Sequence, residues 1–257
     1  MDFVTYVTTF FSGSLVGFSL GLVGGGGSIL ATPLLLYFVG IKNPHFAIGT
    51  SALVVAAGAA NNLIGYIKHN HIYWRPALIF ALFGIVGTFF GSTIGKKIPG
   101  DYLLFYFALF MIGVSFYMFY KSQPIENKEK AICYPLLMGL AFIVGGVSGF
   151  FGIGGGFLIV PSLIFVTGMP IISAIGSSLV SVTSFGLTTA INYAYSDLII
   201  WDVAFIFILG SFVGGYGGRR LARHLALNKN ILHKVFAFIL LLVAIYMLIR
   251  QINFSFL

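Results

Sequence analysis

The feature that most constrains this chain is the length of its charge-free runs. No Asp, Glu, Lys or Arg occurs in residues 3–41 or in residues 131–196. A helix needs about 20 apolar residues to cross a bilayer, so the second run has room for about three crossings. Backbone groups in lipid must be satisfied within the protein, and these runs are far too long for barrel strands. We therefore expect membrane-spanning helices.

Composition indicates the same class and excludes others. Charged residues make up 8% of the 257 residues, against roughly 25% in soluble domains. The net charge of +8 does not indicate a nucleic-acid partner, because the basic residues fall in short gaps between apolar segments, as topology signals do. The N-terminal stretch MDFVTYVTTFF lacks a basic region and a cleavage site, so we interpret it as a retained first helix. We expect a multi-pass protein of the cell (inner or plasma) membrane.

The chain contains an internal repeat. A shift of 128 residues places eight residues of 17–40 on identical residues of 145–168, and a shift of 127 does the same for six residues between 49 and 91. Such an ordered match over about a hundred residues indicates a duplicated half. The expected apolar segments are 3–23, 28–40, 46–67, 75–96 and 102–120, and then 134–152, 156–168, 172–195, 201–221 and 232–250. We predict a first membrane repeat at 1–120, a hydrophilic linker at 121–131 and a second membrane repeat at 132–257.

Charges indicate how the two halves are oriented. The gap at 68–75 contains Lys68 and Arg75, whereas its repeat mate contains Asp197 and Asp202. If the halves are inverted, ten of the 14 basic residues lie on the cytoplasmic side and four outside, as the positive-inside rule favours. Inversion requires an odd number of crossings per half, so the first two segments of each half must begin and end on one side. The expected fold is an all-α polytopic membrane protein of two inverted repeats, with about 8–10 helical segments and glycine-broken or re-entrant helices.

Glycine-rich turns occupy equivalent places in the two halves. The stretch GLVGGGGSILATP (21–33) pairs with GFFGIGGGFLIVP (149–161). Helix breaks at equivalent positions of inverted halves are the best sequence indication of a transporter's central site, and free N–H groups at a helix N-terminus attract anions. The alternative is that these glycines form extramembrane turns or let helices touch. The candidate donors are Gly24, Gly25, Gly26, Gly27, Ser28, Gly152, Gly154, Gly155 and Gly156.

A polar stripe follows each turn. In the second half its hydroxyl and amide residues recur every three or four positions and so share one helix face; the first half keeps part of this pattern. Such a stripe can bind a dehydrated anion, or it can be ordinary hydrogen-bonding between membrane helices. The candidate side chains are Thr50, Ser51, Asn61, Asn62, Ser177, Ser178, Ser181, Thr188 and Asn192. The glycines at four-residue spacing, Gly87, Gly91, Gly95, Gly210, Gly214 and Gly218, are typical of helix packing instead.

Several kinds of chemistry are not indicated. The five histidines show no metal-ligand spacing, the single cysteine forms neither an intrachain disulfide nor a cluster, and no acidic residue lies mid-span, where it would signal proton or cation work. No lysine of a phosphate-binding loop follows the glycines, and no buried nucleophile pair is apparent. We therefore expect no metal, no cofactor and no enzyme activity.

The doubled pattern of a Gly-x-Gly-Gly turn, a following proline and then Gly-(Thr/Ser)-Ser resembles the TauE/SafE family of sulfite exporters, also called TSUP or DUF81 permeases. The resemblance covers about residues 5 to 250. It implies a transporter of small sulfur-containing anions, organosulfonates or related carboxylates, usually with about eight membrane segments. Ser28 stands where the second half has Gly156, and Ala57 where it has Ser184, so the two halves are expected to contribute unequally.

The sequence thus predicts a permease that holds a small anion near the membrane midplane through backbone N–H groups and Ser, Thr and Asn side chains. The expected partners are this small anionic substrate and the lipid bilayer. The sequence leaves the oligomeric state open, a homo-oligomer included. It also leaves two alternatives open: an anion channel, and a non-transporting membrane subunit of a larger complex.

Overall fold

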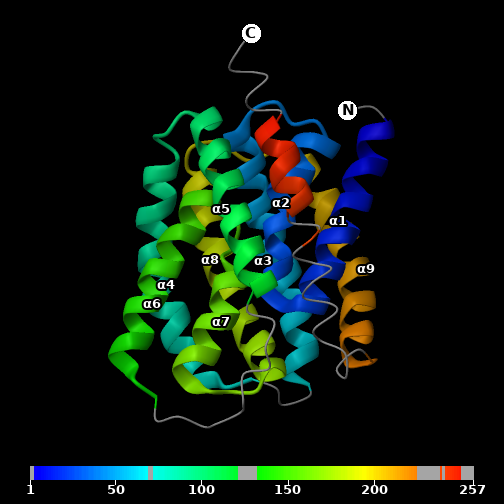
Figure 1. The fold of residues 1–257 in the computed structure, drawn as a ribbon. Coiled ribbons are helices and arrows are strands. Elements are labelled where there is room, and N and C mark those ends of the chain that lie inside the picture. Colours follow the sequence, from blue (N-terminus) through cyan, green and yellow to red (C-terminus); the bar gives the residue numbers. More distant parts are fainter. Residues whose placement is uncertain (1–2, 69–71, 121–131, 225–237, 239–240, 250–257) are drawn as a thin grey trace.

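The computed structural model describes residues 3–68, 72–120, 132–224, 238 and 241–249 (Figure 1). These residues are almost entirely helical and contain no strand. The labelled elements are α1 (Phe3–Val23), η1 (Gly24–Leu30), α2 (Ala31–Pro33), η2 (Leu34–Phe38), α3 (Pro44–Ile67), α4 (Trp74–Gly95), α5 (Gly100–Tyr120), α6 (Tyr134–Phe151), α7 (Gly156–Thr167), α8 (Ile171–Ala194) and α9 (Trp201–His224). Residues 241–249 form a further helix. The linker expected at 121–131, and much of the segment expected at 232–250, lie outside the described residues.

Six helical segments of the described chain are long and apolar enough to cross a membrane. They are Phe3–Phe38, Pro44–Ile67, Trp74–Gly95, Tyr134–Phe151, Ile172–Ala194 and Trp201–Ala222. Their outward faces are apolar: Leu82, Phe205 and Val213 are 64%, 66% and 63% exposed, a pattern that suits lipid rather than water. The prediction of an all-α polytopic membrane protein is confirmed.

The two glycine-rich breaks differ in form. In the first half, α1 passes at Gly24, which has a φ of +71°, directly into the 3₁₀ helix η1, so that residues 3–38 are helical throughout. In the second half, α6 ends at Phe151, and a true turn with Gly152, Gly154 and Gly155 in the left-handed region precedes α7. A side chain in that region costs roughly 1–2 kcal/mol, so these glycines permit the turn.

Repeat mates make the same helix contacts. Gly17 of α1 packs on the backbone of Ser211 in α9, and its mate Gly145 of α6 packs on the backbone of Gly84 in α4, which is the mate of Ser211. The packing predicted for the glycines at four-residue spacing is confirmed, because a Cβ built on any of them would overlap or crowd backbone of the facing helix. These glycines are Gly87, Gly91, Gly95, Gly210, Gly214 and Gly218.

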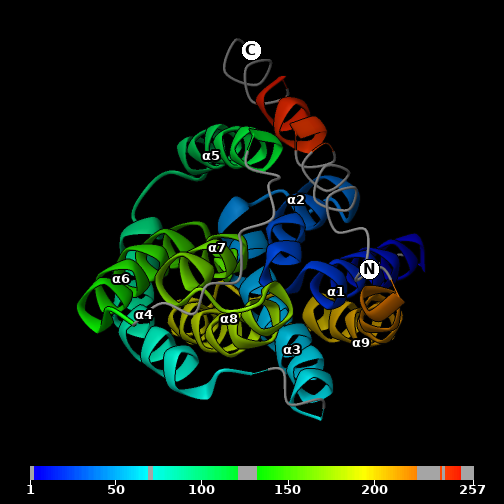
Figure 2. The same ribbon diagram turned by 60° about the horizontal axis from the view of Figure 1, so that its bottom comes forward.

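These contacts sort the long helices into two units. We call α1, α3 and α9 the first unit, and their mates α6, α8 and α4 the second unit. Within each unit the helices run in the same direction, because rising residue numbers on one helix meet rising numbers on its neighbour. In the first unit, Gly13, Gly17 and Gly21 of α1, and Gly58 and Gly65 of α3, meet successively later residues of α9. In the second unit, Gly145 and Gly149 of α6 meet Gly84 and Thr88 of α4, and α4 contacts α8 through Gly84 with Phe185 and then Lys96 with Asn192. Figure 2 shows α1 beside α9 on one side of the bundle and α4 beside α6 on the other.

The two units meet where α3 packs against α8. There Gly49 lies against Tyr193, whereas Gly186 lies against Ala52 and Ala56. Rising residue numbers on one helix therefore meet falling numbers on the other, so these repeat mates run in opposite directions. Inversion of the halves across a bilayer is not tested by these contacts and stays a prediction, although it would give this pattern.

The last helix of each half covers the broken helix of the other half. The ring of Phe110 in α5 packs on Phe151 and Phe157, with ring centroids 5.2 and 5.5 Å apart. Tyr37 of η2 packs edge-on against Tyr246 of the 241–249 helix at 5.3 Å. Figure 2 shows α5 and this terminal helix on the same side of the bundle, next to α7 and α2. The interior around both breaks is therefore enclosed by aromatic side chains on this side.

We predict that Gly214→Ala destabilises the protein and that Gly139→Ala does not. A methyl group on Gly214 overlaps the backbone of Ser14 in α1, so the helices must separate, at a cost of about 1–3 kcal/mol in unfolding free energy. A methyl group on Gly139 meets no atom within 4 Å and improves helix propensity. Thermal unfolding in detergent measures both variants. Equal melting temperatures would contradict the packing role of Gly214.

Candidate functional site

The two glycine-rich breaks meet inside the bundle. Residues 24–30 and 152–157 are all buried, and Gly25 and Gly156 lie backbone to backbone, because a Cβ built on either would overlap the other. These glycines are therefore not solvent-exposed turns. Close packing and a ligand site both remain compatible with the contact.

The start of α7 presents a row of backbone donors. The N–H groups of Gly152 and Ile153 donate to carbonyls of α6, and those of Leu158 and Ile159 donate to Gly155. For the four residues between them, 154–157, the structure records no backbone hydrogen bond from the N–H group. The first N–H groups of any helix lack an intrahelical partner, and the helix dipole places about half a positive charge there.

The first-half break offers fewer donors. Because η1 is a 3₁₀ helix, its N–H groups after the first turn bond to carbonyls three residues earlier. The hydroxyl of Ser28 also donates to the Gly25 carbonyl at 2.7 Å. The two halves thus differ as expected: most of the backbone N–H groups without a recorded hydrogen bond, which we call the uncommitted donors, lie in the second-half turn.

Apolar side chains and a hydroxyl pair surround the contact. The repeat mates Val55 and Val182 flank Gly154, with methyl carbons 2.9 and 3.1 Å from a Cβ built there. On the other side, Ser51 Oγ lies 2.9 Å from Thr32 Oγ1, 2.9 Å from the Ile48 carbonyl and 3.4 Å from the Gly152 carbonyl. Of the hydroxyls that follow the glycine turns in sequence, Ser51 is the one that the structure brings to the opposite turn.

Other candidate hydroxyls serve the helices themselves. Thr50 Oγ1 accepts the Ile200 N–H at 3.1 Å, and its mate Ser177 Oγ accepts the Tyr73 N–H at 3.0 Å, so these two hydroxyls cap the chain where α9 and α4 begin. Ser178 and Thr188 donate to carbonyls of their own helix. Ser181 is buried and has no hydrogen-bond partner.

Two cations bind the candidate asparagines, an arrangement that sequence reasoning missed. Lys96 Nζ donates to the Asn192 carbonyl, to Asn192 Oδ1 and to Ser196 Oγ, each at 2.8 Å. Partial burial lowers the pKa of this ammonium group. Arg219 Nη1 donates to the Asn61 carbonyl at 2.8 Å and to Asn62 Oδ1 at 3.0 Å. We call these two sets the clasps.

Each clasp lies within one unit. The Lys96 clasp joins the end of α4 to the end of α8, and the Arg219 clasp joins α9 to the end of α3. Because α3 and α8 run in opposite directions, the clasps lie at opposite ends of the bundle. Both cations sit near helix C-termini, where the helix dipole favours positive charge. Asn61, Asn62 and Asn192 are thus not gathered at the glycine contact.

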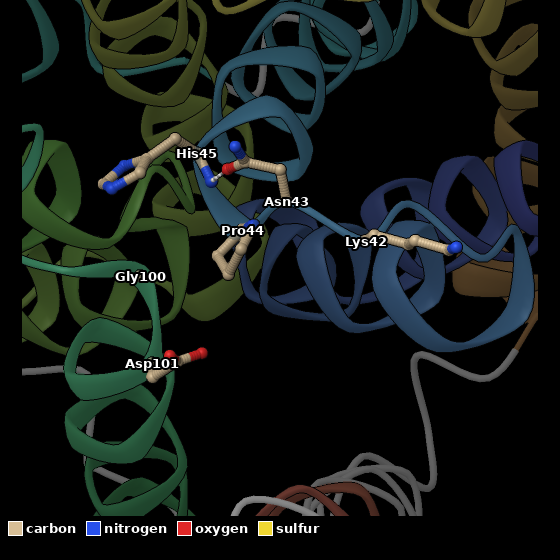
Figure 3. A pocket seen from close by; sticks show the side chains of 6 residues that line it. All are labelled: Lys42, Asn43, Pro44, His45, Gly100 and Asp101. Atoms are coloured by element: carbon tan, nitrogen blue, oxygen red, sulfur yellow. Dashed lines mark hydrogen bonds between the residues drawn. The ribbon is translucent and has the colours of Figure 1, made fainter. Parts of the chain in front are cut away.

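A cavity of about 360 Å³ lies elsewhere, where α3 and α5 begin (Figure 3). It contains none of the candidate site residues. The residues that line it are Lys42, Asn43, Pro44, His45, Gly100 and Asp101. In Figure 3 the side chains of Lys42 and His45 point in opposite directions, so they do not converge on one ligand position.

A bundle of membrane-spanning helices with broken helices buried at its centre defines the class of polytopic helical transporters. Comparison with known families agrees: the family described as "Sulfite exporter TauE/SafE" matches residues 9–247. The chain belongs to this TauE/SafE family and is a multi-pass membrane transporter.

Curated relatives have names of the same kind. The chain is 50% identical to a "Probable membrane transporter protein" of Xylella fastidiosa (strain Temecula1), with 98% of both chains covered. It is 28% identical to the "Probable membrane transporter protein YunE" of Bacillus subtilis, covering 87% of this chain and 89% of that one. It is 23% identical to "Probable membrane transporter protein YfcA" of Escherichia coli, covering 82% and 78%. No solved structure matches the chain.

We predict that Lys96→Met lowers the unfolding free energy by about 1–2 kcal/mol, because Asn192 and Ser196 lose a shared charged donor. Lys97→Met is the matched control, since Lys97 is exposed and the structure records no side-chain hydrogen bond for it. Chemical denaturation in detergent micelles compares the two. A stability loss of the same size in both variants would mean that the clasp contributes nothing specific.

Proposed function

We propose that this protein is a secondary transporter of a small sulfur-containing oxyanion, an organosulfonate or a related carboxylate. The description of the matched family, sulfite exporter, supports this substrate class. The relatives' names support membrane transport and specify no substrate.

The observation that carries the proposal is the buried start of α7 at the contact between the two units. Its backbone donors have no recorded partner, and the side chains flanking Gly154 are apolar. Oriented N–H dipoles in a water-excluded site stabilise negative charge without a fixed cation. Binding by dipoles alone is weaker than binding by a buried Lys or Arg, which suits a carrier that must also release its substrate.

Alternating access would arise from movement of the first unit against the second. The two units meet along α3 and α8 and at the backbone contact of Gly25 with Gly156. The backbone of Gly25 lies directly on that of Gly156. An anion can therefore reach the α7 donors only when these two residues separate. The opposite directions of α3 and α8 support inverted halves, and inverted halves provide two equivalent openings on opposite sides.

The energy source follows from the absence of a mid-span acid. The six acidic residues of the sequence all lie near segment ends or in the linker, so a carboxylate relay is not available. The anion then either carries its own proton or follows the membrane potential. That potential drives an anion outward by about 2.3 kcal/mol per charge per 100 mV.

We predict that Gly156→Ala abolishes substrate flux in proteoliposomes, tested with sulfite, thiosulfate, sulfoacetate and sulfate in turn. The added methyl group overlaps the backbone of Gly25 and displaces the α7 donors. Gly139→Ala, which meets no atom within 4 Å, should transport like the wild type. Normal flux in Gly156→Ala would reduce the glycine contact to packing, and flux that never saturates with concentration would favour the channel alternative.

The inverted arrangement has its own test. Cysteines replace the repeat mates Trp74 and Trp201, which are 46% and 64% exposed, in a Cys133→Ser background because native Cys133 is exposed. An impermeant thiol reagent should label one variant from outside intact cells and the other only after permeabilisation. Labelling of both from the same side would overturn the inversion.

A further inference from the structure

One buried hydroxyl at the start of α7 has no hydrogen-bond partner. Ser148 of α6 is fully buried, and its Oγ contacts no donor or acceptor of the described chain. Most helical hydroxyls here behave differently: Thr93, Thr167 and Ser184, for example, donate to the carbonyl four residues earlier. A buried polar group left unsatisfied costs about 1–3 kcal/mol, so its retention calls for an explanation.

Ser148 lies beside Gly155 in the second-half turn. A Cβ built on Gly155 would lie 2.6 Å from Ser148 Cβ and 2.9 Å from Ser148 Oγ, so the hydroxyl occupies the space beside Gly155. Gly155 has a φ of +62° and belongs to the four residues whose N–H groups have no recorded partner. A hydroxyl without a partner and amides with no recorded hydrogen bond therefore lie together at the N-terminus of a 12-residue helix.

The first half does not reproduce this arrangement. The repeat mate of Ser148 is Leu20, and the mate of Gly155 is Gly27, which packs on the backbone around Leu20. Another partnerless hydroxyl, Ser211 Oγ, faces Gly58 at the α3–α9 contact instead. The coincidence of hydroxyl and amides is thus a property of the second-half turn.

We propose that Ser148 and the amides of residues 154–157 form a single subsite for a monoanionic oxyanion, with the Ser148 hydroxyl as its side-chain donor. This inference rests on the proposed transport function and assigns its substrate contact to one half. The first-half break acts as the opposing wall, because its Gly25 covers Gly156.

The charge of the ligand follows from what the subsite contains. It offers N–H and O–H donors, glycine backbone and the methyl groups of Val55 and Val182, and no cation. The Born cost of burying an ion grows with the square of its charge, whereas its attraction to fixed dipoles grows only in proportion to the charge, so a subsite of dipoles alone favours one negative charge over two. For sulfite the favoured species is hydrogensulfite, and doubly charged sulfate is expected to bind more weakly.

The experiment compares Ser148→Ala with Ser12→Ala in proteoliposomes. Ser12 is the matched control, because it is also a buried serine with no partner and lies in α1, outside the second-half turn. In Ser148→Ala the KM for sulfite should rise about tenfold or more, because the anion loses one hydrogen bond from the hydroxyl. Its melting temperature should not fall, since the hydroxyl has no protein partner to lose. Ser12→Ala should keep the wild-type KM.

The charge of the ligand is tested by measuring the wild-type KM across the second ionisation of sulfurous acid. We expect a KM that is constant when expressed as hydrogensulfite and that rises with pH when expressed as total sulfite. A KM constant in the dianion would overturn the monoanion subsite, as would a KM for Ser148→Ala equal to that of Ser12→Ala. Those results leave transport itself intact, whereas a wild-type protein that moves none of the tested anions would overturn the proposed function as well.

Discussion

Backbone polar groups buried away from water must be paired or enclosed by protein, and the centre of this bundle depends on how that requirement is met. Helix breaks deep in a membrane protein survive only where other protein surrounds them. Here each break is the surface on which the other is buried, through the contact of Gly25 with Gly156. Side chains at either position would force the breaks apart. The glycines along α4 and α9 have a related role, because the lack of a side chain allows neighbouring helices to approach until backbone meets backbone.

Duplication of the break did not keep the two copies alike. In the first half, residues 24–30 tighten into a 3₁₀ helix, and Ser51 ties α3 both to Thr32 and to the Gly152 carbonyl. The mates of Thr32 and Ser51 are Val160 and Ser178, and Ser178 bonds only within its own helix. One copy has become a well-bonded wall while the other keeps an open helix start. Under the proposed function, the second-half turn would then supply most of the contacts to the anion.

The sequence was sufficient to predict the helical membrane class, the boundaries of most described helices to within a few residues and the packing role of the spaced glycines, because these depend on local composition and period. It did not predict that the chain stays helical from Phe3 to Phe38, where separate segments at 3–23 and 28–40 were expected. It was not sufficient for the polar residues. Thr50 and Ser177 follow a glycine turn in sequence, yet their hydroxyls cap chain segments about 100 to 150 residues away. Likewise Asn62 and Asn192 are committed to cations of the other half. Such partners are set by tertiary packing, which the sequence alone does not give. They recur in pairs because each contact between the two halves has an equivalent contact between their repeat mates.

The packing groups the helices into units that differ from the two halves of the sequence repeat. Gly17 with Ser211, and Gly145 with Gly84, lock helices of different halves together without intervening side chains, and the clasps fasten the same units at opposite ends. A displacement of one sequence half against the other would break both locks and both clasps at once. A displacement of the first unit against the second would leave all of them intact, and would open the contact of α3 with α8, the glycine contact and the contacts that flank it, such as Gly24 with Ile175. Since the uncommitted donors of α7 lie at that contact, the movement of the units proposed for alternating access would expose them.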